Sequence, residues 1–165
     1  MDRDADRSQV YAVEDAWSCV LDRGGPVDFF GSQLYLPVQR RFGDLSAMQA
    51  YADHCLARSG LGLPPIRVRP RQGQRRAHYE GAADGIAVIA IPLQARWACR
   101  ESVLLHELAH HVVAFDPEVR SAALHGRPFR QAICRLAELA LGPEAALLLR
   151  TGYQGAGLEV AAHVA

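Results

Sequence analysis

The sequence predicts an α+β fold in which a small, twisted, mostly antiparallel sheet packs on helices. Several segments carry apolar residues at the spacing of one helical face, which predicts amphipathic helices. Three short β-branched or apolar segments between residues 66 and 91 predict strands. A further apolar segment, over about 99–114, predicts a buried helix at the centre of the fold. The 165 residues have the length of one domain, and we expect a single domain over 1–165.

The first third of the chain predicts two helices and one strand. Residues 8–23 place apolar side chains on one stripe, and the sequence Gly-Gly-Pro that follows ends this helix. Residues 28–37 carry aromatic residues in alternation, which predicts a strand interrupted by a glycine. Ser46 and Gln49 form a capping-box pattern, so we expect a second helix to begin there and to end at Gly60.

The middle of the chain predicts three strands, over 66–69, 77–80 and 86–91. The last two flank the glycine-rich segment 81–85, which predicts a hairpin loop between them. The last strand is apolar throughout, so we expect both of its faces to be covered.

The last third predicts helices. The helix over about 99–114 ends before an Asp-Pro pair, and a loop over 115–126 follows. Pro128 suits the first turn of the next helix. Gly142 and Pro143 separate that helix from a last one, which we expect to end at about Arg150.

Composition excludes several classes of protein. The formal net charge is zero, with 18 basic and 18 acidic residues, so no overall field attracts nucleic acid or a membrane. The four cysteines form no C-x-x-C pair, which argues against a zinc ribbon and favours reduced, buried thiols. No apolar run is long enough to span a membrane, and the charged first residues precede no apolar core. We therefore expect no signal peptide and a cytoplasmic location.

The predicted central helix contains the motif H-E-x-x-H. Residues i and i+4 share one helical face, so His106 and His110 are expected to direct their imidazoles at one metal ion. Glu107 projects beside them and can accept the proton of a metal-bound water. Two ligands and a base on one rigid turn are typical of zinc-dependent hydrolases, so we expect one zinc ion per chain. Surface histidines on an ordinary amphipathic helix are the alternative, but they leave Glu107 among apolar neighbours without a reason.

A catalytic zinc takes three protein ligands and leaves one position for water. His125 is the favoured third ligand, because the chain turns back after the helix and Gly126 permits a close approach there. Asp116 stands where related motifs place a third ligand after a glycine, but Val113 occupies the glycine position. Glu118 is a third candidate, in a looser geometry.

The sequence HELAHH at 106–111, followed by HGRPF at 125–129, resembles the minimal zincins, in which a later histidine completes a three-histidine zinc site. More closely, the chain resembles a small actinobacterial family of metallohydrolases, itself distantly similar to the SprT-like proteases. Besides the motif helix, the similar stretches are VYAVEDA at 10–16, LPVQRRF at 36–42, AHYE at 77–80, WACRE at 97–101 and GPEA at 142–145. This resemblance implies a zincin-like fold, His106, His110 and His125 as ligands, and Glu107 as the base.

The expected function is that of a zinc-dependent metallohydrolase, and specifically of a metallopeptidase that cleaves an amide bond in a peptide or protein. In zincin-like folds the strand before the motif helix can form an edge that binds an extended peptide, which makes residues 86–92 the candidate edge. One alternative is a metalloprotease that cleaves a regulator, with Glu118 as a ligand. The other is a non-enzymatic binding module in which Asp116 or Glu118 closes the zinc site.

Two further groups of residues are candidates for function. Tyr153 is the candidate to stabilise the oxyanion formed when water attacks a carbonyl, and Tyr79 and Arg100 could also do so. Five arginines lie within ten residues, at Arg67, Arg69, Arg71, Arg75 and Arg76. They could contact phosphate, as in a DNA-associated protease, or form a solvated edge that opposes aggregation. The zero net charge and the absence of a C-x-x-C ribbon favour the solvated edge.

Overall fold

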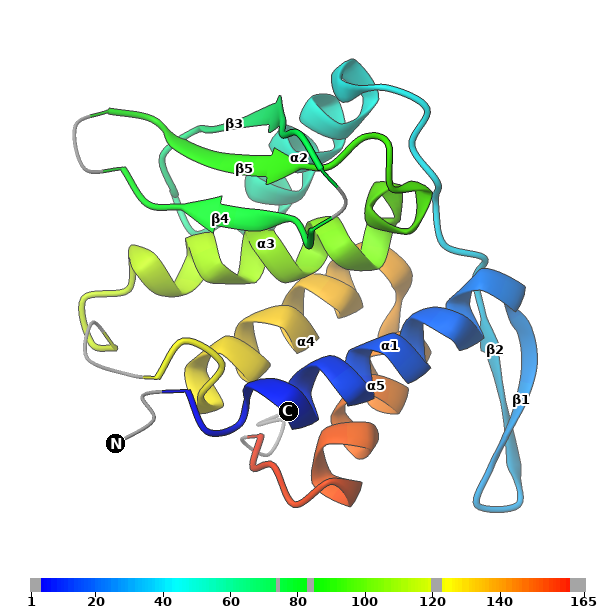
Figure 1. The fold of residues 1–165 in the computed structure, drawn as a ribbon. Coiled ribbons are helices and arrows are strands. Elements are labelled where there is room, and N and C mark those ends of the chain that lie inside the picture. The colour runs from blue at the N-terminus through cyan, green and yellow to red at the C-terminus, as the bar shows by residue number, and fades with distance from the viewer. Residues whose placement is uncertain (1–3, 74, 83–84, 120–122, 161–165) are drawn as a thin grey trace. The chain divides into compact units, whose positions relative to one another are not determined.

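The computed structural model describes residues 4–73, 75–82, 85–119 and 123–160 (Figure 1). Over these residues it has five α-helices, one short 3-10 helix and five strands in two small sheets. The predicted α+β class is confirmed. The chain groups into two compact units, one formed by Met1–Gln39 with Ser121–Ala165 and the other by Arg40–Arg120. The single domain over 1–165 stays a prediction.

The first unit consists of three helices and a hairpin. Its helices are α1 (Arg7–Arg23), α4 (Arg127–Leu141) and α5 (Pro143–Gly155). The buried Trp17 on α1 donates its indole N–H to the carbonyl oxygen of Ala145 on α5, at 3.0 Å. The last helix runs five residues beyond the predicted end at Arg150.

The predicted strand over 28–37 is wrong, because this part of the chain is a hairpin of β1 (Gly25–Phe29) and β2 (Ser32–Leu36). Both turn residues have positive φ, with Phe30 at 49° and Gly31 at 82°. A two-residue hairpin turn needs this left-handed backbone at both positions, and Asn-Gly is its usual signal. Phe-Gly does not give that signal, so the sequence pattern did not reveal the turn.

The second unit begins with α2 (Leu45–Ser59), whose N-terminus differs from the prediction. Asp44 caps it by accepting the backbone N–H of Ala47 at 2.8 Å. The left-handed Gly60 ends it, as predicted. Gln49 was expected to take part in a capping box with Ser46, but it makes other contacts. Its amide donates to the carbonyl of Ile66 and accepts the N–H of Val68, both at 2.8 Å, and so occupies the edge of the next strand.

Three strands of the second unit form a mixed sheet in the order β3-β5-β4. In Figure 1, β5 (Ala87–Ile91) lies between β3 (Ile66–Pro70), to which it is parallel, and β4 (His78–Glu80), to which it is antiparallel. The prediction that 86–92 offers a free edge is therefore wrong. An unbroken apolar run marks a strand covered on both faces, and here that strand is also paired on both sides.

A short 3-10 helix, η1 (Arg96–Cys99), leads into α3 (Glu101–Ala114), which carries the H-E-x-x-H motif. Figure 1 shows α3 running along the sheet beside β4, and it contacts β4, β5 and α2. Its first residue, Glu101, is fully buried and accepts three hydrogen bonds: from the N–H of Arg40 (2.7 Å), its guanidinium (2.6 Å) and the hydroxyl of Tyr51 (2.5 Å). The helix ends just before Asp116 and Pro117, as predicted.

Candidate metal site

His106 and His110 point their rings at the same place beside α3. Their Nε2 atoms are 3.3 Å apart and their ring centroids 5.0 Å apart. Two nitrogens bound at about 2.0–2.1 Å to a tetrahedral zinc lie about 3.3–3.4 Å from each other. The helical spacing of the motif therefore sets the distance that two zinc ligands need.

Glu107 lies next to these histidines on a nearly buried helix. It is 4% exposed, and its apolar neighbours Leu105 and Leu108 are fully buried. Removing a carboxylate from water costs free energy unless a partner compensates for it. A buried acid beside two histidines on the same helix could hold and deprotonate a metal-bound water.

His125 belongs to the first unit, in the turn before α4. It is 4% exposed. The turn is tight, because the N–H of Gly126 donates to the carbonyl of Ala123 at 2.9 Å. A Cβ on Gly126 would lie only 3.0 Å from that carbonyl oxygen. This agrees with the expectation that a glycine is needed beside His125.

His106, His110 and His125 form a group of described histidines that could each offer one ring nitrogen to a metal ion. Two of these histidines are buried and His110 is half-buried. The donor set is three imidazoles, which suits zinc and also suits other first-row divalent metals. These three imidazoles are the candidate ligand set.

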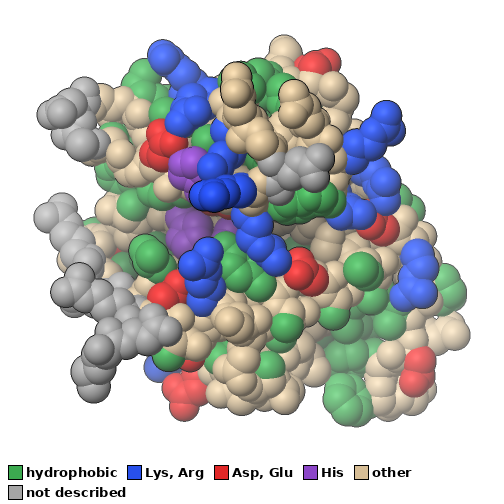
Figure 2. Space-filling model, viewed as in Figure 1, with side chains coloured by type: hydrophobic (Ala, Val, Ile, Leu, Met, Phe, Trp, Pro, Cys, Tyr) green, Lys and Arg blue, Asp and Glu red, His purple; other side chains and the backbone are tan. Residues whose placement is uncertain are grey.

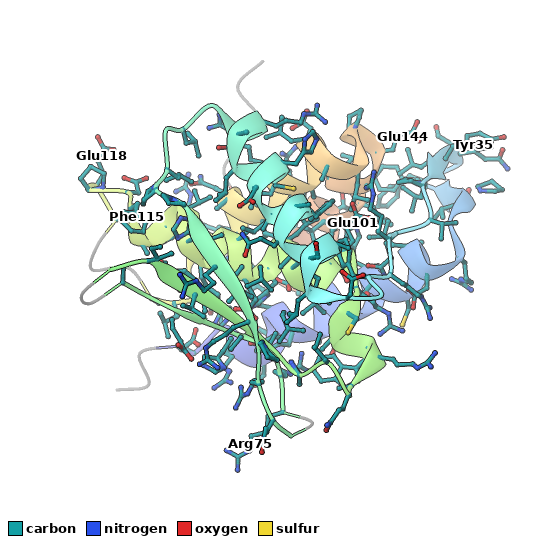
Figure 3. The ribbon with its side chains drawn as sticks, turned by 90° about the horizontal axis from the view of Figure 1, so that it is seen from above. Tyr35, Arg75, Glu101, Phe115, Glu118 and Glu144 are labelled. Atoms are coloured by element: carbon teal, nitrogen blue, oxygen red, sulfur yellow. The ribbon has the colours of Figure 1, made fainter. Side chains whose placement is uncertain are left out.

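Asp116 and Glu118, the other predicted candidates, do not belong to this group among the described residues. Asp116 instead accepts the N–H of Glu118 at 2.9 Å in the loop after α3. Glu118 is exposed, and Figure 3 shows its side chain at the outside of that loop.

His111 links α3 by hydrogen bonds to two other segments of the second unit. It is fully buried, and its Nε2 lies 2.8 Å from the carbonyl oxygen of Pro64. Because a carbonyl can only accept, Nε2 carries the hydrogen and Nδ1 is the acceptor of the neutral ring. The hydroxyl of Tyr79, 3.1 Å from Nδ1, is then the donor. Burial lowers the pKa of His111 and raises that of Tyr79, which keeps both groups uncharged.

Tyr153, the predicted oxyanion stabiliser, lies in the core of the first unit. It is fully buried, and its hydroxyl donates to the carboxylate of Glu14 at 2.6 Å. This engagement argues against an oxyanion role. Arg100, another candidate, is half-buried immediately before α3 and forms an isolated β-bridge with Arg41.

The arginine cluster between residues 67 and 76 is partly neutralised within the sheet. Arg69 pairs with Glu80, whose carboxylate also accepts from His78 at 2.7 Å. The hydrogen bond from His78, assisted by Arg69, lowers the pKa of Glu80. Arg71 lies 2.6 Å from the other ring nitrogen of His78, and Figure 2 shows arginine and histidine side chains side by side at the surface. These contacts fit a solvated face, and phosphate binding stays a prediction that they do not favour.

Similarity to known proteins does not identify this chain, since it matches no protein-family model, no curated protein and no solved structure. Among the described residues, no helix has both the length and the apolar character needed to cross a membrane. The residues of the site are therefore what indicates a function.

Proposed function

We propose that this protein is a zinc-dependent metallohydrolase of the minimal zincin type, and specifically a metallopeptidase. The observation that carries the proposal is the pair of Nε2 atoms of His106 and His110, 3.3 Å apart, with the buried Glu107 beside them. His125 completes a set of three ligands, which is the number that leaves a catalytic zinc open to water.

Bound zinc would supply a water of lowered pKa and would polarise the carbonyl to be cleaved. His106, His110 and His125 would hold the metal as neutral imidazoles. Glu107 would accept the proton of the attacking water and return it to the leaving amine. The side chain of Glu107 is 4% exposed and follows His106 directly in the chain, which suits this role.

An extended peptide is the proposed substrate, and β4 is the proposed binding edge in place of the predicted 86–92. β4 is an edge strand of the described sheet and packs against α3. The ring of Tyr79 on β4 stacks with that of His110, their centroids 6.4 Å apart. A peptide added to β4 by main-chain hydrogen bonds would therefore pass close to the motif helix.

Elemental analysis of the purified protein and of His125→Ala tests the metal site. We expect one equivalent of zinc in the wild type and strong loss in the variant. His54→Ala, at an exposed histidine on α2, is the matched control and should keep its zinc. If the wild type takes up no metal even after incubation with zinc, the proposal fails.

The variant Glu107→Gln tests the proposed role of Glu107 as general base. It should keep zinc and lose at least about 100-fold in turnover of a peptide library, because general base catalysis contributes that much. A binding module has no turnover to lose. The regulator-cleaving alternative has Glu118 as a ligand, and the binding-module alternative has Asp116 or Glu118. Zinc retained in His125→Ala would therefore favour these alternatives.

A further inference from the structure

The ring of His125 is held by an acidic side chain more than a hundred residues earlier in the chain. Nδ1 of His125 lies 2.7 Å from Oδ2 of Asp4. The backbone N–H of His125 donates to Oδ1 of the same carboxylate at 3.2 Å. The side chain of His125 is buried, at 5% exposure, that of Asp4 is 15% exposed, and both residues belong to the first unit. The Asp4 carboxylate therefore accepts hydrogen bonds from both the ring and the main chain of His125.

This contact determines which ring nitrogen carries the hydrogen. A carboxylate accepts hydrogen bonds, so the nitrogen facing Asp4 must be the donor. In a neutral imidazole the other nitrogen is then the basic one. Asp4 thus selects the tautomer in which Nδ1 is protonated and Nε2 is the nitrogen that can coordinate a metal.

The surroundings of His125 make this orientation rigid. Arg130, only 4% exposed, donates to the carbonyl oxygen of His125 at 2.8 Å and to Asp6 at 2.7 Å. The rings of Phe129 and Tyr11 flank the imidazole, with centroids 4.9 Å and 5.3 Å away. Of these contacts, that of Asp4 is the one made to a ring nitrogen.

We propose that Asp4 is a positioning residue of the metal site, which orients His125 and presents its Nε2 to the ion. This inference rests on the proposed function, since it assumes that His125 is a ligand. A carboxylate behind a ligand histidine is the usual way in which proteins fix a ligand ring, and its removal weakens metal binding about 10–100-fold. No sequence pattern marks Asp4, because it stands near other acidic residues and far from the motif.

Zinc affinity, measured by competition with a chelator, tests the proposal. Asp4→Ala should bind zinc about 10–100-fold more weakly than the wild type. Asp4→Asn should lose less, because its amide oxygen can still accept from Nδ1. Asp28→Asn removes the same charge at an exposed position on β1 and should bind like the wild type.

A spectroscopic readout separates positioning from a merely structural ion pair. The visible spectrum of the cobalt(II)-substituted protein reports ligand geometry, and we expect it to change in Asp4→Ala and to stay unchanged in Asp28→Asn. If Asp4→Ala does not fold, Asp4→Asn carries the same test with a smaller effect. Wild-type affinity and an unchanged cobalt spectrum in the folded Asp4 variants would overturn the inference. Failure of the wild type itself to bind metal would instead overturn the proposed function.

Discussion

A tyrosine hydroxyl has one hydrogen to donate, so Tyr153 or Tyr79 can stabilise an oxyanion only if that hydrogen is not already donated elsewhere. The hydroxyl of Tyr153 gives its hydrogen to Glu14 inside a core. That of Tyr79 gives its hydrogen to Nδ1 of His111, whose Nε2 is committed to the carbonyl of Pro64. Tyr79 lies beside His110 and could turn its hydroxyl toward a bound substrate. Tyr153 would first have to leave a buried carboxylate.

Tyr153→Phe therefore tests a residue-scale assignment. The loss of a hydrogen bond to a charged acceptor should lower the free energy of unfolding by about 1.5–3 kcal/mol. Zinc affinity and turnover of the folded protein should not change. Urea unfolding together with steady-state kinetics would check both. Lost turnover at unchanged stability would restore the oxyanion role of Tyr153.

At the scale of the element, α3 is fastened at its start by a buried acid. Glu101 accepts from Arg40 and Tyr51, and so ties the segment before α2, α2 itself and α3 together (Figure 3). Burial raises the pKa of Tyr51, so its hydroxyl stays protonated as a donor, and Glu101 raises the pKa of Arg40. The same helix is fastened one turn from its end by His111.

Glu101→Gln should weaken the hydrogen bonds that hold the N-terminus of α3. The neutral amide keeps one acceptor where the carboxylate has two, so we expect a loss of roughly 1–3 kcal/mol in unfolding free energy. The value stays modest because the side chain of Arg40 is 60% exposed and water screens its charge. Glu118→Gln, an exposed acid in the loop after the same helix, is the control in a parallel urea titration. Equal stability of the two variants would mean that Glu101 does not fasten the helix.

Features that depend on local geometry were predicted from the sequence, and contacts between distant segments were not. The sequence predicted all five described helices, from apolar spacing and from glycine and proline at their ends, and the spacing of His106 and His110 predicted that both side chains share one helical face. These features depend on local helical geometry. The hairpin at Phe30 was missed, since its turn lacks the usual residues. The parallel pairing of β5 with β3 and the contact of Asp4 with His125 were missed because both join segments that are apart in the sequence, and no local pattern records such contacts.

At the scale of the whole molecule, a metal ligated by three histidines should stabilise the folded chain. A ligand that binds only the folded state adds RT ln(1 + [L]/Kd), or about 4 kcal/mol at a free concentration a thousand times Kd. In a chain of 165 residues, each kcal/mol raises Tm by about 2–4 °C. Zinc-loaded protein should therefore melt roughly 10 °C above the chelator-treated protein.

The matched variants make this measurement specific. His54→Ala should gain as much from zinc as the wild type, because its exposed ring lies on α2, outside the three-histidine group. His106→Ala and His125→Ala should gain little, since two ligands hold a metal less tightly than three. A melting temperature that zinc raises equally in all variants would indicate nonspecific binding and contradict the site. A rise confined to proteins with all three histidines would tie the stability of the fold to the chemistry proposed for it.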